Sequence, residues 1–211
     1  MPLARPKEKI ERRIGEKLFL KGERSFSPKS AFTRKPYPPG EHGRKRTRRG
    51  GRSEYGLLLR EKQKVRHTYG LGDRMLKKYF TKALLDRRRP TAETLAETLE
   101  RRLDNVVFRL GLAISRSVGR HMVSYGHIQV NGRPVRQPSF LVRIDDNIAI
   151  KESSSEKGLF QDLGQRLQKY TPPEWLELDK EKRTGKILRL PNLGDIIIQQ
   201  NMTLVVEYYS K

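Results

Sequence analysis

Residues 99–135 read LERRLDNVVFRLGLAISRSVGRHMVSYGHIQVNGRPV, and this stretch decides the fold class. Apolar residues first recur every three or four positions, as on one face of a helix, and later alternate with polar residues, as in a strand. The stretch therefore predicts helices followed by a small antiparallel sheet, which is the pattern of an α+β fold.

The first helix of this region is expected from Thr91 or Thr94 to Leu110. Thr94 and Glu97 have the spacing of a capping box, and Gly111 suits the left-handed conformation that closes a helix. The apolar stripe consists of Leu95, Leu99, Leu103, Val106, Val107 and Leu110. We therefore expect one continuous helix with one buried face.

A second, shorter helix is expected from Ser115 to Tyr125. Val118 falls on its apolar side, whereas Arg116 and Arg120 fall roughly opposite. Such a helix buries one side against the protein and leaves its basic side for a partner.

The segment HIQVNGRPV at 127–135 contains the hairpin signal Asn131-Gly132, because both residues tolerate a positive φ. The second helix, the turn after it and this hairpin are expected to form one basic ridge over an apolar floor. The candidate RNA-contacting residues of the ridge are Ser115, Arg116, Arg120, His121, His127 and Asn131. A ridge of this kind reads RNA shape and backbone more than base sequence. The alternative is an ordinary polar helix face and hairpin edge.

The same reasoning extends outward to both sides. Upstream, Ser53 is expected to cap a helix that ends at Gly70, and Asp73 to cap a second one that ends before RRRP at 87–90. Downstream, the pattern predicts strands over 139–150 broken at Asp145-Asp146, an amphipathic helix with Leu159, Leu163 and Leu167, and strands at 186–190 and 203–210.

The expected architecture is therefore an extended basic N-terminal arm, a small helical domain, and a second domain of helices packed on a small antiparallel sheet. The boundaries expected for these parts are 1–45 for the arm, 46–94 for the helical domain, 95–155 for the helix and hairpin domain, and 156–211 for a C-terminal helix and strands that complete the fold.

The charge is strongly positive and unevenly distributed. The formal net charge is +22, with 28 Lys and Arg against 9 Asp and Glu in residues 1–90, and 18 against 15 in residues 91–211. A charge of this size exceeds what solubility requires and indicates a polyanionic partner, either nucleic acid or an anionic membrane surface.

The densest positive run is RKRTRRGGR at 44–52, and it continues into LREKQKVRH on the helix that follows. An isolated run of this kind is ordinarily a solvated tail. Phosphate contact is favoured here, because arginine dominates the run, and its planar fork suits paired contacts to phosphate oxygens. The candidate residues are Arg44, Lys45, Arg46, Arg48, Arg49, Arg52, Arg60, Lys62, Lys64 and Arg66.

Signatures of catalysis, metal binding and membrane insertion are missing from the sequence. There is no cysteine, no phosphate-binding loop, no nucleophile elbow and no ligand spacing among the four histidines. Asp145-Asp146 is best explained as a solvated turn. No run reaches the ~18 to 20 apolar residues of a membrane span, and the charged start lacks the apolar stretch of a secretory signal. The sequence thus predicts a soluble intracellular protein that is not an enzyme and has no membrane partner.

Taken together, residues 99–135 closely resemble the RNA-binding domain named after ribosomal protein four of the small subunit. The flanking motifs YPPGEHG at 37–43, LREKQKVRHTYG at 59–70, WLELD at 175–179 and VVEYYSK at the end resemble the bacterial-type ribosomal protein four family itself. Several motifs in the correct order over essentially the whole chain are more specific than any one of them.

This resemblance implies direct binding of small-subunit ribosomal RNA at a multi-helix junction and nucleation of subunit assembly. It also implies contact with the neighbouring ribosomal protein five, at an interface that affects decoding accuracy, and a position of Arg44 to Arg52 near the channel through which messenger RNA enters. The expected location is the ribosome, in the cytoplasm or in an organelle.

The chain departs from the family pattern at one place. Many family members hold zinc with four cysteines near the N-terminus, and the corresponding positions here are Glu8, Glu11, Ser25 and Ser30. Serine hydroxyls are poor zinc ligands, and two carboxylates alone do not make a structural site. The sequence therefore predicts an arm without metal or cofactor, held by RNA and by packing of Leu18, Phe19, Leu20 and Phe26.

Two alternatives stay open at this point. An RNA-modifying enzyme that uses the same domain as an anchor would need a catalytic domain of ~100 residues or more. A DNA-binding protein is the other, because two helices and a hairpin also suggest a helix-turn-helix.

Overall fold

The computed structural model of the protein describes residues 6–44, 53–155, 158–195 and 201–211. The chain divides into two units, one comprising Met1–Leu95 with Ile198–Lys211 and the other comprising Ala96–Ile197. The division falls inside helix α5 (Thr91–Glu100), which belongs to both units. The segment that the sequence grouped as 156–211 is likewise shared between them.

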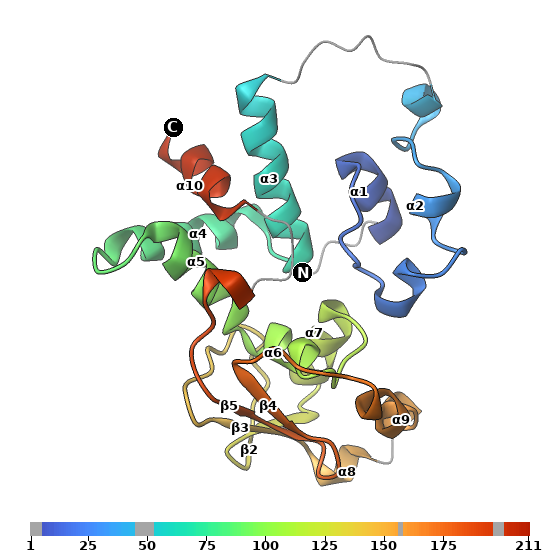
Figure 1. The fold of residues 1–211 in the computed structure, drawn as a ribbon, viewed down its shortest axis with the longest axis vertical. Coiled ribbons are helices and arrows are strands. Elements are labelled where there is room, and N and C mark those ends of the chain that lie inside the picture. The colour runs from blue at the N-terminus through green and yellow to red at the C-terminus, as the bar shows by residue number, and fades with distance from the viewer. Residues whose placement is uncertain (1–5, 45–52, 156–157, 196–200) are drawn as a thin grey trace. The chain divides into compact units, whose positions relative to one another are not determined.

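The described part of the first unit is helical (Figure 1). Besides α5, its elements are α1 (Lys7–Ile14), α2 (Ala31–Arg34), α3 (Glu54–Thr68), α4 (Asp73–Leu85), α10 (Met202–Ser210) and the 3-10 turns η1 (Gly22–Ser25) and η2 (Glu41–Arg44). Helix α3 begins as predicted, because the Ser53 hydroxyl accepts a hydrogen bond from the Gly56 amide at 3.2 Å. Gly70, with φ +62°, follows its end, which is the left-handed conformation expected there.

The predicted cap of α4 is wrong by one residue. Gly72 occupies the N-cap position, and Asp73 is the first helical residue. Its carboxylate forms ion pairs with Lys62 and, at 3.1 Å, with Arg66 of α3. Burial alone would raise the pKa of Asp73, but the hydrogen bond from Lys62 and the charge of Arg66 lower it below its ordinary value. Asp73 thus joins two helices instead of capping one.

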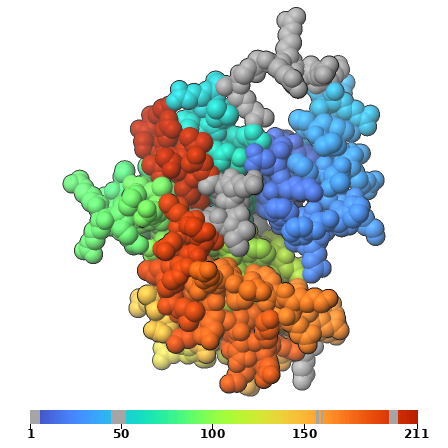
Figure 2. Space-filling view, in the orientation of Figure 1, coloured from blue at the N-terminus to red at the C-terminus, as the bar shows by residue number. Residues whose placement is uncertain are grey.

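The strand predicted at 203–210 is wrong, because this segment forms helix α10. The Asn201 side chain accepts hydrogen bonds from two backbone amides of the first turn, at 3.1 and 3.3 Å. Met202 and Val205 are buried, and α10 lies against α3, as the red and cyan surfaces in Figure 2 show. Burial at helical spacing here outweighs the strand preference of β-branched and aromatic residues.

The arm is held by a buried carboxylate as well as by apolar contacts. Glu11 is 1% exposed, and its Oε1 accepts hydrogen bonds from the amides of Leu18 at 3.2 Å and Leu20 at 3.1 Å. Burial raises the pKa of Glu11 above its ordinary value. Leu18 is buried as expected, whereas Phe19 and Phe26 are exposed and stack on each other at 4.8 Å.

The second unit combines helices with one antiparallel sheet. Its helices and turns are α6 (Leu103–Arg109), α7 (Arg116–Ser124), α8 (Glu152–Ser155), η3 (Gly158–Phe160), α9 (Leu163–Gln168) and η4 (Leu193–Asp195). Its strands are β1 (Ile128–Val130), β2 (Arg133–Pro134), β3 (Asn147–Ile150), β4 (Leu176–Asp179) and β5 (Thr184–Ile187). They form a sheet of order β2-β1-β3-β5-β4, which confirms the predicted α+β class.

One apolar cluster joins the helices of this unit to the sheet. Its fully buried members include Leu103, Val106, Val107, Leu110, Val123, Ile128, Val142, Ile148, Leu167, Trp175 and Ile187. Helix α6 lies directly on β5, since a Cβ at Gly185 would fall 2.4 Å from Leu110 Cδ2. Glycine at this position sets the distance between helix and sheet.

The single helix predicted up to Leu110 is also wrong, because the chain leaves the helical path at Arg102. Arg102 has φ −64° and ψ 133°, which is extended backbone, and it forms an isolated bridge with Leu141. The Leu103 amide then donates to the Phe140 carbonyl at 2.8 Å. Residues 138–142 therefore take backbone hydrogen bonds that a continuous helix would have used.

The hairpin prediction is confirmed, with φ +51° at Asn131 and +76° at Gly132 between β1 and β2. Other strand limits differ from those expected. Strands were expected over 139–150, but only β3 is a regular strand there. The strand expected at 186–190 is β5, which begins two residues earlier, and its partner β4 was not predicted. The amphipathic helix begins only at Leu163. Among the described residues, no helix is both long and apolar enough to cross a membrane.

Candidate RNA-binding surface

Helix α7 carries the centre of the predicted ridge, and its start is fixed by Ser115. This residue is extended and buried, and its hydroxyl accepts a hydrogen bond from the Val118 amide at 3.4 Å. Gly119 lets α7 approach α6 closely, since a Cβ there would lie 2.7 Å from the backbone oxygen of Asp104. Ser115 thus has a structural role in the ridge, because its side chain caps α7.

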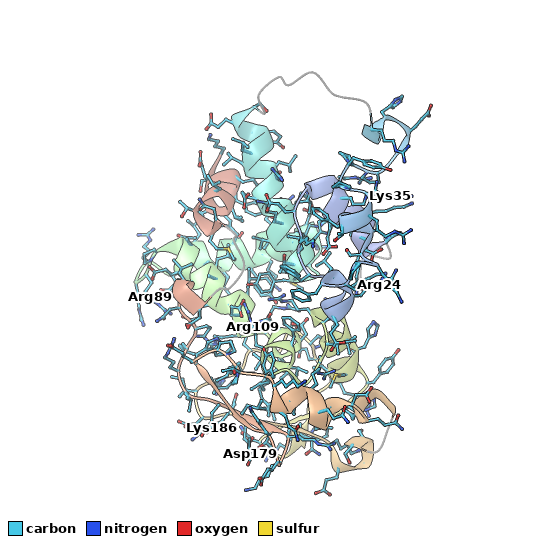
Figure 3. The ribbon with its side chains drawn as sticks, turned by 45° about the vertical axis from the view of Figure 1, so that its right-hand side comes forward. Arg24, Lys35, Arg89, Arg109, Asp179 and Lys186 are labelled. Atoms are coloured by element: carbon cyan, nitrogen blue, oxygen red, sulfur yellow. The ribbon has the colours of Figure 1, made fainter. Side chains whose placement is uncertain are left out.

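A buried polar network supports this helix pair from below. The Glu100 carboxylate accepts hydrogen bonds from Arg109 Nε at 2.9 Å, Arg109 Nη2 at 2.8 Å and Asn105 Nδ2 at 2.8 Å. Glu100 is 0% and Arg109 4% exposed, and Figure 3 shows Arg109 among the helices. In this network each buried charge is matched by an opposite one.

The two arginines predicted on the ridge are both near polar groups of α6. Arg116 Nε donates to Asn105 Oδ1 at 2.7 Å, and its guanidinium lies 4.6 Å from the centre of the Phe108 ring. Arg120 Nη1 is 4.0 Å from Asp104 Oδ2, a carboxylate that Arg102 holds at 2.6 Å. Both arginines are half-buried. The Arg120–Asp104 distance of 4.0 Å is long for an ion pair, and phosphate contact by either arginine stays a prediction.

The other ridge residues divide into outward and inward groups. His121 is exposed on α7, and His127 Nδ1 lies 3.0 Å from the Ser154 hydroxyl. Asn131 donates to Asp146 Oδ1 and accepts from the Asn147 amide, both at 2.8 Å. Its side chain therefore fixes the hairpin to β3, which the sequence did not indicate.

The cations of α3 are engaged in ion pairs within the protein. Arg60 and Lys64 pair with Glu16 at 3.0 and 2.7 Å, while Lys62 and Arg66 pair with Asp73. Lys62 and Lys64 are buried. The sequence counted these four residues as candidate phosphate contacts, and the structure gives all four acidic partners.

The basic run lies mostly outside the described residues, which include neither Lys45, Arg46, Arg48, Arg49 nor Arg52. Arg44 is described and exposed. Its Nε donates to the Tyr37 hydroxyl at 2.9 Å, which lowers the pKa of Tyr37. RNA contact by this run stays a prediction.

A second basic surface, not predicted from the sequence, lies between α1 and α2. It is a cavity of about 280 Å³ lined by Lys7, Glu8, Lys9, Arg12, Lys21, Arg34 and Lys35, together with Pro6 and Ala31. Burial and then the charge of Lys21 lower the pKa of Lys7. Arg12 is oriented by Nε hydrogen bonds to the carbonyls of Lys35 at 2.9 Å and Tyr37 at 3.0 Å. Tertiary structure gathers these cations from separate segments, so no charge run marks them.

The four positions that correspond to zinc cysteines have other roles. Ser25 accepts a hydrogen bond from the Lys21 amide at 3.3 Å, and Glu8 pairs with Arg24 at 3.2 Å. Glu11 binds two backbone amides, and Ser30 is buried beside α2. The described residues contain no group of three or more His, Asp or Glu side chains placed to hold a metal.

Comparison with known families follows the division of the chain. The model of the ribosomal protein S4/S9 N-terminal domain matches residues 2–100, and that of the S4 domain matches residues 101–148, which contain α6, α7 and the hairpin. The helix pair and hairpin are thus those of an S4-domain protein.

Similar proteins extend the match to nearly the full length. The small ribosomal subunit protein uS4 of Syntrophomonas wolfei is 47% identical over 201 residues, which is 95% of this chain and 94% of that protein. Proteins of the same description from Halothermothrix orenii and Thermus thermophilus are each 46% identical, again over 95% of this chain and 94% of theirs. The chain belongs to the uS4 family of small ribosomal subunit proteins.

Family membership confirms the predicted family and settles the question of catalysis. The chain is a structural protein of the ribosome, located in the cytoplasm, and not an enzyme. The alternative of an RNA-modifying enzyme is therefore wrong.

Proposed function

We propose that this chain binds small-subunit ribosomal RNA directly and nucleates assembly of the body of the subunit. The observation that carries the proposal is the match of the S4 domain to residues 101–148, a segment that contains the outward basic helix α7 and Arg109, whose buried ion pair with Glu100 supports it. A net charge of +22 supports a polyanionic partner of this kind.

Within this proposal, the described residues that contact RNA lie on two surfaces. The first is the outer side of α7, with Arg120 and His121. The second is the cation-lined cavity between α1 and α2. The cations of α3 that pair with Glu16 and Asp73 stabilise the first unit. They contribute to RNA binding mainly through the net positive charge of these groups. The run from Arg44 to Arg52 reaches phosphates near the channel through which messenger RNA enters.

Contact with the neighbouring ribosomal protein five and an effect on decoding accuracy belong to the same proposal. They are supported by membership of the uS4 family. Crosslinking within assembled subunits would test the protein contact, and misreading rates of subunits with an altered interface would test the effect on accuracy.

The experiment for RNA binding is a competition at matched salt. Labelled small-subunit ribosomal RNA is bound to the full chain and displaced by unlabelled small-subunit RNA, large-subunit RNA or duplex DNA. We expect small-subunit RNA to compete far better than the other two, and footprinting to show protection confined to one junction. Equal competition by duplex DNA would instead favour a general polyanion binder.

A further inference from the structure

Three aromatic side chains form a row where α7 ends and β1 begins. The ring centres of His121 and Tyr125 are 6.0 Å apart at an interplanar angle of 16°, and those of Tyr125 and His127 are 6.3 Å apart at 45°. Tyr125, in the middle of the row, is 70% exposed. Behind it, His127 meets the buried ring of Phe160 edge-on at 6.1 Å.

Local structure holds this row in place. His121 and Tyr125 are four residues apart and therefore share one side of the helix end. Gly126, with φ +72°, turns the chain so that His127 leads into β1. The ring of His127 is fixed by the Ser154 hydroxyl at 3.0 Å.

A cation stands beside the row. A Cβ on Gly126 would lie 3.1 Å from Arg136 Nε, so the exposed Arg136 side chain crosses the turn next to Tyr125. The row and this guanidinium come from α7, the turn between α7 and β1, and the segment after β2, which only the folded unit brings together.

A single exposed tyrosine is common on protein surfaces and requires no explanation. The row differs in having polar aromatic neighbours and an adjacent arginine. An apolar protein partner would bury the exposed imidazole of His121 and the exposed guanidinium of Arg136 without offering either a hydrogen-bond partner. A nucleotide satisfies both needs, because its base stacks on an aromatic ring and its phosphate accepts from arginine.

We propose that Tyr125 is a stacking platform for one unpaired RNA base, flanked by His121 and His127, and that Arg136 contacts a phosphate of the same or the adjacent nucleotide. This inference rests on the proposed RNA-binding function. The ridge is expected to read the shape and backbone of the RNA. The stacking platform adds one position at which the RNA must present an unstacked base.

The test compares Tyr125→Ala and Tyr125→Phe in binding small-subunit ribosomal RNA. Loss of one stacked base costs about 1 to 3 kcal/mol, which corresponds to about 5- to 150-fold weaker binding. We expect this loss for Ala and less than about a twofold change for Phe, which keeps the ring. Tyr55→Ala, which removes a 60% exposed tyrosine of α3, is the matched control and leaves affinity unchanged.

Salt dependence separates the two proposed contacts. Tyr125→Ala lowers affinity equally at all salt concentrations, because stacking releases no counterions, whereas Arg136→Ala reduces the slope of log K against log salt by about 0.7 to 0.9. Scanning single abasic nucleotides through the footprint identifies the base. The correct abasic site weakens the wild type and has little further effect on Tyr125→Ala.

Each outcome has one meaning. If the wild type shows no preference for small-subunit RNA, the proposed function itself fails. If the wild type binds and Tyr125→Ala matches it, only the stacking platform fails, and the row is an ordinary surface. Equal loss in the Phe variant would show that the hydroxyl and not the ring makes the contact, which also overturns the proposal. Fluorescence of the buried Trp175, in the same unit as Tyr125 and Arg136, verifies that the variants at these two positions are folded, and far-UV circular dichroism verifies the Tyr55→Ala control.

Discussion

The buried pair of Glu100 and Arg109 allows a quantitative test of what holds the helix pair under the RNA-binding surface. Arg109→Met would remove the two hydrogen bonds from the Arg109 guanidinium to the buried Glu100 carboxylate and leave that carboxylate without its opposite charge, while Asn105 Nδ2 still donates to it. Glu100→Leu would leave a guanidinium that is 4% exposed without its carboxylate. Removing one partner of a buried ion pair costs about 3 to 5 kcal/mol.

This cost is large against the ~5 to 15 kcal/mol that stabilise a typical domain. The double variant Glu100→Leu with Arg109→Met removes both charges and replaces them with apolar groups. We expect its loss to be smaller than the sum of the two single losses by at least about 1 kcal/mol, because no uncompensated charge stays buried.

Urea unfolding followed by the fluorescence of Trp175 measures these losses. Trp175 is the only tryptophan, is 0% exposed and lies in the same unit. The matched control is Lys186→Met, which breaks the exposed pair between Lys186 and Asp145 at 2.9 Å (Figure 3 labels Lys186). We expect no measurable loss there, because solvent screens exposed pairs.

The reasoning would be refuted if both single variants lost less than about 1 kcal/mol, as exposed pairs do. It would equally be refuted if the two losses simply added in the double variant. Either result would mean that the network does not carry buried, mutually compensating charges.

Three further predictions concern the arm, the helix contact and the ridge. Burial raises the pKa of Glu11, so its ionisation lowers stability as the pH rises from the ordinary glutamate value, ~4.3, through the folded one. Glu11→Gln keeps an acceptor for the amides of Leu18 and Leu20 but does not ionise. Hydrogen exchange of these two amides should therefore be slower in the variant than in the wild type at a pH above the folded pKa of Glu11, and similar in both at a pH below ~4.3. Gly119→Ala places a Cβ against the Asp104 carbonyl and should lower the free energy of unfolding by about 1 to 3 kcal/mol, measured by tryptophan fluorescence. Arg120→Ala should reduce the slope of log K against log salt for RNA binding by about 0.7 to 0.9, whereas Arg116→Ala should mainly lower stability; equal slopes for both and for the wild type would remove α7 from the RNA surface.

Features that depend on one or two residues were predictable from the sequence. Asn131-Gly132 defines its own turn, and Ser53 and Ser115 cap helices through bonds to amides three residues away. The break at Arg102 was not predictable, because its hydrogen-bonding partners lie near residue 140, almost forty positions along the chain. Local pattern in that region favours an unbroken helix.

The sequence identified the basic residues of the candidate RNA-binding surface, but not the groups within the protein that these residues contact. Charge counting identified the cations of α3 and Arg116, while the fold places acidic or polar groups beside them. The opposite holds for Tyr125 and Arg136. Neither belongs to a charge run, and the fold places the Arg136 side chain against Gly126, the residue after Tyr125.

The return of α10 to α3 has a consequence for the order in which the protein is made. The buried face of α3 includes Leu58 and Val65, yet α10, which packs on this helix, begins only at Met202. At ~5 to 20 residues per second, synthesis of the intervening chain takes on the order of ten seconds. The second unit, which is continuous from Ala96 to Ile197, is synthesised in full before α10, whereas the first unit still lacks its last helix at that point. The unit whose synthesis begins first is thus the unit whose sequence is completed last, and until α10 has been made the face of α3 that it covers stays exposed.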